Sequence, residues 1–158
     1  MTVDHGSREN NAQVDTLALR ICSAFQCIEA DVLAVSRALS LTEQALAKKV
    51  GVQDVERVRL SIWSEWPEHA RQTMTQAATV LFSNSDAIRG FAFDQYVVLK
   101  FSDFEPTLLA HELRHVTQWE QYGNRFEYMT EYIRQIIESG YRNSFFERDA
   151  RAFESFAK

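Results

Sequence analysis

Apolar residues recur at intervals of three and four over much of this chain, and this spacing is that of a helix with one buried face. The longest run begins at Val14 and ends at Leu39, and its apolar positions are Leu17, Ile21, Phe25, Ile28, Val32 and Val35. A second run occupies residues 124–140 and ends at Gly140, with a stripe at Phe126, Met129, Ile133 and Ile136. The period therefore predicts a mainly helical protein.

Capping residues and turn residues indicate four further helices. We predict them over residues 41–51, 69–82, 105–122 and 144–158. The signals are side chains that accept from free amides at a helix start, proline in a first turn, and glycine at a helix end. They are Thr42, Asp103 and Ser144 as N-caps, Pro106 in the first turn of the third helix, and Gly51 and Gly123 as stops.

Two segments favour strands because β-branched and aromatic residues dominate them. They are residues 55–63 and 91–101, and the second lies directly before the predicted helix at 105–122. We therefore expect an α+β fold, mainly helical, with a small sheet of two or three strands.

Length and charge limit the classes of protein to consider. A chain of 158 residues is long enough for one domain with its own core. We assign residues 14–158 to it, with a helical N-terminal part at 14–52 and the strands and site at 55–158, and expect residues 1–13, which are polar, to be a mobile tail. The net charge of −5 argues against a nucleic-acid partner.

The location is inferred from segments that the sequence lacks. No run of eighteen apolar residues is present, and the start has neither a cationic nor an apolar stretch, so we expect a cytoplasmic protein without a membrane partner. Cys22 and Cys27 lie in an apolar helical pattern and are expected to be reduced core residues, with a disulfide or zinc clasp as the alternative. The sequence predicts no particular oligomeric state.

The segment LLAHELRHVTQWEQYG, residues 108–123, contains a His-Glu-x-x-His motif formed by His111, Glu112 and His115. On a helix, residues four apart lie about 40° from one another, so both imidazoles can bind one metal ion. Glu112 is offset from them, where its carboxylate can reach a water on that ion. The alternative is a solvated helix that carries two imidazoles by chance. Zinc usually takes three protein ligands, so a third must come from another segment.

Glu147 and Ala150 form a Glu-x-x-Ala pattern in the last predicted helix. A His-Glu-x-x-His motif followed by this pattern resembles the gluzincin branch of the zinc metallopeptidases. The resemblance implies that His111, His115 and Glu147 bind Zn²⁺ and that Glu112 is the general base. Glu147 has a second interpretation, because Ser144 and Glu147 also fit a capping box. In that case Asp149 and Glu154 are the alternative ligands.

Residues 57–151 more narrowly resemble small bacterial zincin-like domains of unassigned role. This resemblance implies an active-site strand at 92–100 beside the motif helix. Gluzincins carry an acidic residue four positions after the ligand glutamate, but here that residue is Arg151. A hydroxyl that polarises the substrate carbonyl has three candidates, Tyr122, Tyr132 and Tyr141, and we name Tyr141 as the catalytic one.

The sequence as a whole predicts a zinc metallopeptidase that hydrolyses a peptide or protein substrate. Two alternatives belong to other classes. One is a non-catalytic interaction domain in which zinc joins two helices. The other is a DNA-binding helix-turn-helix, which residues 41–52 resemble, although the acidic charge and the strand predicted after them argue against it.

Overall fold

The protein folds into six α-helices and a four-stranded sheet over the residues that the structure, a computed structural model, describes (5–79, 81, 88–100 and 105–158). The helices are α1 (His5–Val35), α2 (Leu41–Lys49), α3 (Glu68–Ala78), α4 (Pro106–Tyr122), α5 (Arg125–Ser139) and α6 (Phe145–Phe153). The strands are β1 (Arg37–Ala38), β2 (Arg59–Ile62), β3 (Gly90–Phe93) and β4 (Tyr96–Leu99). Short 3-10 turns follow β2, α5 and α6 at Trp63–Glu65, Tyr141–Asn143 and Glu154–Ala157. The α+β class, mainly helical, is confirmed.

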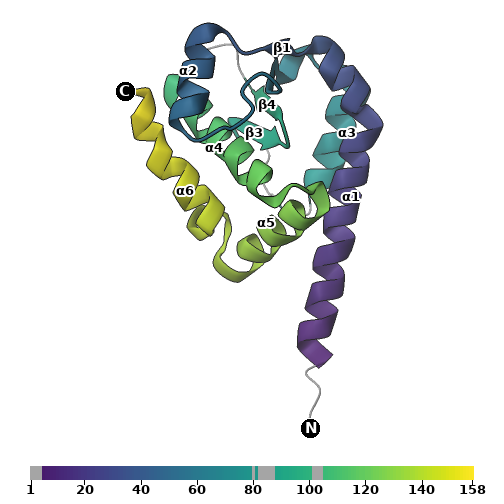
Figure 1. Cartoon of the computed structure of the whole chain (residues 1–158). Helices are drawn as coiled ribbons and strands as arrows, with labels where there is room; N and C mark the ends of the chain where they lie inside the picture. Colours follow the sequence, from purple (N-terminus) through teal and green to yellow (C-terminus); the bar gives the residue numbers. More distant parts are fainter. Residues whose placement is uncertain (1–4, 80, 82–87, 101–104) are drawn as a thin grey trace.

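The sheet is mixed and has the order β1-β2-β4-β3. The two central strands, β2 and β4, are parallel, while β1 and β3 pair with them in antiparallel register on either side. The strand β3 therefore lies at one edge, with Phe91 opposite Val98 and Phe93 opposite Tyr96. Figure 1 shows the sheet beside α4, with α1 and α3 packed together on the far side of the molecule from α6.

Several boundaries differ from the sequence prediction. The single strand predicted at 91–101 is a hairpin, because the chain turns at Asp94, whose φ of 51° lies in the left-handed region. The strand β1 was not predicted and raises the sheet to four strands rather than two or three. Helix α1 begins at His5 rather than Val14, and Asp103, the predicted cap of α4, lies outside the described residues.

The N-cap of α2 is Ser40 and not Thr42. Ser40 accepts from the backbone N–H of Glu43, while the Glu43 carboxylate accepts from the Ser40 N–H and from the Arg37 guanidinium. The capping box that this forms satisfies the free amides at the start of a nine-residue helix. The segment after α2 leads into β2 rather than into a second helix, so the helix-turn-helix interpretation is wrong.

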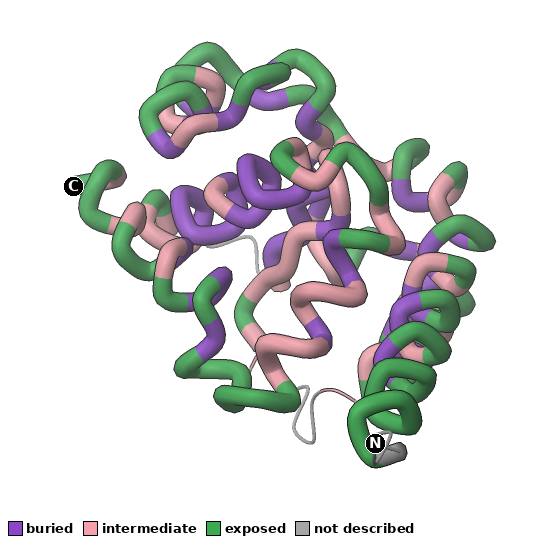
Figure 2. Tube along the Cα trace, turned by 60° about the horizontal axis from the view of Figure 1, so that its bottom comes forward, coloured by how far each residue is buried: buried purple, intermediate pink, exposed green. Residues whose placement is uncertain are grey.

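The core has two apolar clusters, and α4 contributes to both. One cluster joins α1, α3, the β3–β4 hairpin and α5, and it includes Phe25, Phe93 and Trp119. The other joins α2, β2 and β4 to the opposite face of α4, through Leu109 and Leu113. Figure 2 shows α4 as the most continuously buried helix. The motif helix is thus central to the fold.

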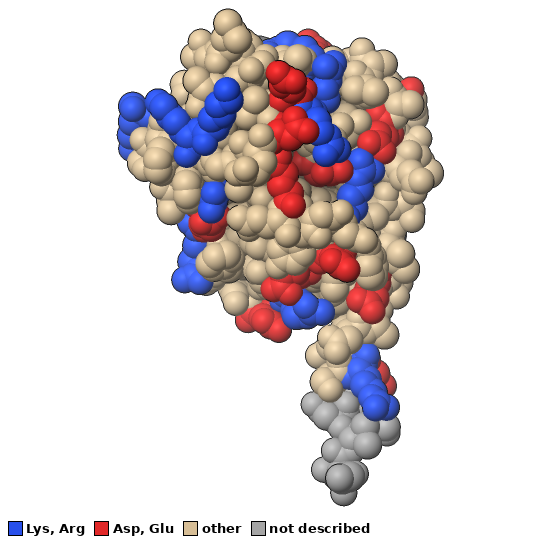
Figure 3. All heavy atoms as spheres, viewed as in Figure 1, with Lys and Arg blue, Asp and Glu red and all other residues tan. Residues whose placement is uncertain are grey.

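The surface and the cysteines add two observations. On the face drawn in Figure 3, Lys and Arg side chains lie beside Asp and Glu over the centre of the molecule, and several Lys and Arg side chains lie together at the upper left. Cys22 is half-buried and Cys27 is exposed, and both are free, so Cys27 is not the core residue that the sequence predicted. Among the described helices, none combines the length and the apolar character needed to span a bilayer.

Candidate metal centre

Helix α4 holds the motif in a buried position. Pro106 lies in the first turn, where its missing N–H costs nothing, and Gly123 closes the helix with a φ of 64°. Leu109, Leu113 and Val116 bury the sheet-facing side, as predicted. The polar side is buried as well, because α5 and α6 cover it, and His115 is only 6% exposed. The interpretation of this segment as a solvated helix is therefore wrong.

Glu147 enters the site from the start of α6. Its neighbour Phe146 is buried in the core, stacked on Tyr128 at a centroid distance of 4.9 Å, which holds the first turn of α6 against α4 and α5. The Glu147 carboxylate then lies 3.2 Å from His111 Nε2 through Oε2, and 3.3 Å from His115 Nε2 through Oε1. His111, His115 and Glu147 thus form a buried cluster that can hold a metal ion.

Both imidazole rings are oriented by a second hydrogen bond. His111 Nδ1 lies 2.9 Å from a Glu154 carboxylate oxygen, and His115 Nδ1 lies 2.8 Å from Gln118 Oε1. Both partners can only accept, so each Nδ1 carries the proton. The Gln118 amide is itself oriented, because its Nε2 donates to the Phe146 carbonyl and to Asp149. In the neutral rings, each Nε2 therefore presents a lone pair to the cluster.

These lone pairs converge at a spacing that suits zinc. The two Nε2 atoms lie 3.2 Å apart, with the anionic Glu147 beside both. Such an arrangement is repulsive unless a cation or additional protons lie among the donors. A tetrahedral zinc ion about 2.0–2.1 Å from each donor separates the donors by about 3.3 Å. The separation of the two Nε2 atoms matches that value, and Glu147 meets each imidazole through a different carboxylate oxygen, at 3.2 and 3.3 Å. One donor atom from each of the three residues lies within 4.8 Å of the other two, so the residues can hold a metal ion such as zinc.

Without a metal, protons stabilise the same cluster. Burial lowers the pKa of His111 and of His115, but the hydrogen bonds and charge of Glu147 outweigh it, so both pKa values are raised. For the Glu147 carboxylate, burial raises the pKa and the two histidines lower it to well below its usual range. The site thus keeps one carboxylate ionised between two imidazoles, and a metal must compete there with protons.

The structure separates the two interpretations of Glu147. Ser144 caps α6 by accepting from the Glu147 N–H, at 3.4 Å. The Glu147 side chain points instead to the two histidines, so only half of the capping box forms. The alternative ligands have other partners: Asp149 pairs with Arg114 at 2.7 Å, and Glu154 binds the outer nitrogen of His111.

Glu112 lies next to the cluster and is almost fully buried. Its Oε2 atom has no hydrogen-bond partner within the described part of the chain. Burial is the largest of several influences on the Glu112 carboxyl, and the pKa is raised to about 8. Gly90 of β3 allows the close approach of the strand, because a Cβ there would lie 3.3 Å from Glu112 Oε1 and 3.0 Å from the Val98 carbonyl. A buried carboxylate with an oxygen that lacks a partner is a feature of sites with a reactive role.

The three candidate tyrosines occupy different positions. Tyr132 donates to Glu147 Oε1 at 3.3 Å. Tyr141 lines the same cavity as Glu112 and Glu147, and burial together with these carboxylates raises its pKa. Tyr122 packs edge-on against Tyr128 and Phe146, at centroid distances of 5.6 and 5.8 Å, and so lies partly buried against the core. Both Tyr132 and Tyr141 are therefore placed to contact a ligand.

Two supporting residues have roles that the sequence did not reveal. Gln118 was placed on the histidine face of the helix but given no role, and Glu154 was considered only as an alternative ligand. Glu154 contacts the outer nitrogen of His111, whereas the resemblance to gluzincins implied a carboxylate four positions after Glu147, where this chain has Arg151. Arg151 itself donates to the Arg142 carbonyl. The sequence did contain a signal for this role of Glu154, because Glu154 lies about one helical turn after Arg151, the position where an acidic residue was expected.

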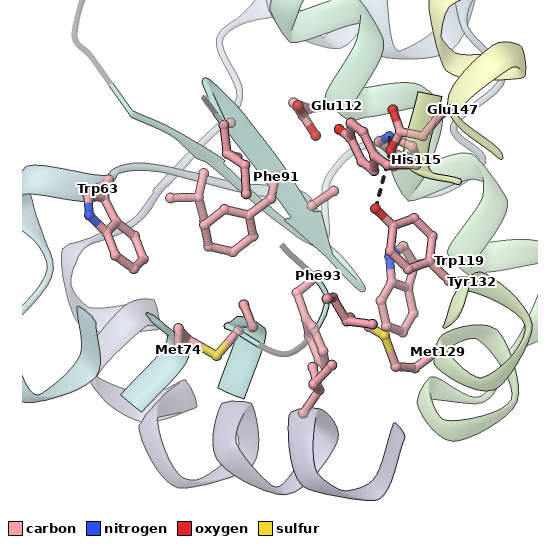
Figure 4. Close-up of a pocket in the computed structure, with 18 of the residues that line it drawn as sticks. Trp63, Met74, Phe91, Phe93, Glu112, His115, Trp119, Met129, Tyr132 and Glu147 are labelled. Atoms are coloured by element: carbon pink, nitrogen blue, oxygen red, sulfur yellow. Dashed lines mark hydrogen bonds and ion pairs between the residues drawn. The ribbon is translucent and has the colours of Figure 1, made fainter. Parts of the chain in front are cut away.

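A cavity of about 390 Å³ opens beside the cluster. Glu112, His115 and Glu147 lie at one end of it, and the remainder extends past β3 towards α3 (Figure 4). Ligand pockets in proteins are commonly about 300 Å³ or larger, so this space can take more than water. The candidate metal donors thus face a space in which a substrate could lie.

Comparison of the chain with protein-family models, with curated proteins and with solved structures found no match. The structure itself shows a buried His-His-Glu cluster that could bind a metal ion.

Proposed function

We propose that this protein is a zinc-dependent hydrolase that cleaves peptide bonds. The observation that carries the proposal is the convergence of His111 Nε2, His115 Nε2 and the Glu147 carboxylate, next to the buried Glu112, whose Oε2 has no hydrogen-bond partner among the described residues. When bound, zinc would lower the pKa of a coordinated water and polarise the substrate carbonyl.

The chain's own residues supply the proton transfers. Glu112 is the general base that takes a proton from the attacking water and then passes it to the leaving amine. Its burial keeps bulk water away from that proton, and a cation held at the histidines would favour its ionised form. Tyr141, which lines the cavity, is placed to donate to the developing oxyanion, and Tyr132 orients Glu147.

The edge strand β3 offers a way to hold an extended peptide. Among the described residues, β3 pairs along one edge only, with β4, and Gly90, Phe91 and Ala92 line the cavity. A peptide added in strand conformation would gain main-chain hydrogen bonds along this edge. The resemblance to zincins implies the same arrangement.

The deciding experiment compares wild type with Glu112→Gln, which keeps the shape of the side chain and removes the base. Zinc content should be unchanged, and cleavage of a peptide library should fall at least about a hundredfold. The matched control is Glu120→Gln on the same helix, which removes a carboxylate that binds the backbone N–H groups of Gln53 and Asp54 away from the site and should leave the rate intact. Equal rates for Glu112→Gln and wild type would contradict the mechanism.

A second candidate function is a non-catalytic interaction domain. It is favoured because the donors join α4 to α6 across the 31 residues that lie between His115 and Glu147, as a structural zinc would. In that case zinc should bind and stabilise the protein while no peptide is cleaved by wild type. The buried Glu112, whose Oε2 has no partner in the described part of the chain, and the adjoining cavity have no role in such a domain, which is why the hydrolase is preferred.

A further inference from the structure

The cavity beside the metal cluster has two chemically different ends. Figure 4 shows Glu112, His115 and Glu147 together at one end and Met74 and Trp63 at the other, with Phe91 and Phe93 between them. The cavity therefore extends from the reactive groups past the edge strand to α3.

The end away from the cluster is built from aromatic rings and a thioether. Its walls include Trp63 and Phe91, whose rings meet edge-on with centroids 5.8 Å apart, and Met74. Aromatic faces bind flat apolar groups, and methionine side chains adapt to groups of different shape. This end is suited to an apolar ligand of variable outline.

Charge in the cavity gathers near the cluster. The charged lining residues are Glu112, His115, Glu147 and Lys100. The backbone of Lys100 lies near the same end, because its N–H donates to the Arg89 carbonyl, next to the Gly90 that approaches Glu112. The apolar end has no charged lining residue among the described residues, so burying a charged or strongly polar group there would cost free energy without compensation.

The inner wall is held rigid by the core behind it. Phe93 stacks on Phe25 at a centroid distance of 4.1 Å and meets Trp119 at 4.8 Å. Phe93 and Trp119 are 2% and 3% exposed. Because these side chains are already fixed, binding a ligand against them costs little conformational entropy. An apolar group that fills this end therefore keeps most of the free energy gained by leaving water.

We propose that this apolar end binds the bulky apolar side chain next to the cleaved bond, so that the substrates are peptides with a large aromatic or aliphatic residue at that position. This inference rests on the proposed function and names the substrate class of the same site. The side chain lies against Trp63, Phe91 and Met74 while the neighbouring amide lies at Glu112. A cavity of about 390 Å³ exceeds what a small side chain could fill, so glycine and alanine would leave it occupied by water.

The test measures binding first, so that it does not depend on cleavage. Acetyl-phenylalanine amide, acetyl-leucine amide and acetyl-glycine amide are titrated into the zinc-free protein, and their dissociation constants are measured by ligand-observed NMR. The phenylalanine and leucine compounds should bind at least about tenfold more tightly than the glycine compound, as burial of a large side chain predicts.

Variants on α3 locate the binding. Ala78→Phe places a ring in the apolar end and should abolish the preference for large side chains. The matched control is Gln76→Phe, which adds the same ring on the exposed side of the same helix, outside this cavity, and should keep the preference. Circular dichroism checks that both variants fold. If a variant does not fold, the comparison of the three amides on the wild-type protein still tests the proposal.

The outcomes separate this inference from the proposed function. Equal binding of the three amides to wild type overturns the inference, as does a preference that survives in folded Ala78→Phe. Cleavage of a peptide library by the zinc-loaded protein without selection for bulky apolar residues overturns it too, while leaving the hydrolase proposal intact. Selective binding of the large amides together with no cleavage of any peptide overturns the hydrolase and retains an apolar ligand site.

Discussion

Single protons decide what the buried cluster can bind. Because the Nδ1–H groups of His111 and His115 are committed to Glu154 and Gln118, both Nε2 atoms are available to one ion. The motif spacing predicted the two histidines, but not the tautomers. The tautomer of each ring depends on which acceptor lies at its Nδ1. For His115 the acceptor is Gln118, three residues later on α4. For His111 it is Glu154, in the turn after α6, which reaches the ring because α6 packs against α4.

Removal of the third ligand should abolish tight zinc binding. In Glu147→Gln the carboxylate between the two imidazoles becomes a neutral amide, and zinc affinity should fall by more than about a hundredfold because zinc rarely takes an amide ligand. Ser144→Ala is the matched control, since it removes the cap of α6 and leaves the ligand. Zinc affinity measured by competition with a chelator checks both. Loss of affinity in Ser144→Ala alone would mean that Glu147 serves only the cap.

The amide that orients His115 should matter without touching the metal. Gln118→Leu removes the acceptor of the His115 Nδ1 proton, so zinc affinity should fall about 10- to 100-fold. Tyr128→Phe is the control, because it removes only the hydroxyl that donates to the same Gln118 oxygen and leaves the histidine's hydrogen bond. The same competition titration measures both variants. An affinity in Gln118→Leu equal to that of Tyr128→Phe would show that the orientation of His115 does not depend on Gln118.

At the scale of secondary structure, most helices were predicted and the sheet was predicted poorly. Helices α4 and α5 end at Gly123 and Gly140 as expected, because a glycine in the left-handed region is a strong local signal. The hairpin was missed because Asp94 and Gln95 turn the chain without a glycine, and apolar residues continue on both sides. The two-residue strand β1 carries no pattern, and only its pairing with β2 defines it.

The start of α2 should give the protein a pH-dependent stability. The hydrogen bond from Arg37, together with those from Ser40, lowers the pKa of Glu43 to about 2 in the folded state. A lowered pKa means that the stabilisation is fully present above the unfolded value, near 4.5, and is lost as the pH falls towards 2. Glu43→Gln should therefore cost about 1 kcal/mol of unfolding free energy at pH 7, and less as the solution becomes acidic.

Urea unfolding of the zinc-free protein between pH 7 and pH 3 measures this difference. Glu56→Gln, at an exposed position before β2, is the control for the change in net charge. A Glu43→Gln deficit that is the same at pH 7 and pH 3 would show that the capping box does not depend on an ionised carboxylate.

At the scale of the whole molecule, the candidate metal centre joins parts of the chain that pack on different sides of α4. His111 and His115 belong to the helix that contributes to both apolar clusters, while Glu147 belongs to α6 and Glu154 to the turn after it. Bringing three donors together in this way orders the C-terminal helix against the core. Zinc should therefore stabilise the entire fold, and not the site alone.

The protein as purified should hold about one equivalent of zinc, and its removal should lower the melting temperature. A ligand present at a hundred times its dissociation constant stabilises the folded state by about 2.7 kcal/mol, which corresponds to about 5–10 °C for a chain of this size. Chelation of wild type should cause this decrease, and restored zinc should reverse it. His115→Ala should melt at the same temperature with and without zinc, because two remaining donors bind the ion weakly. A wild-type melting temperature that zinc does not change, together with no transition metal by elemental analysis, would mean that protons alone hold His111, His115 and Glu147 together.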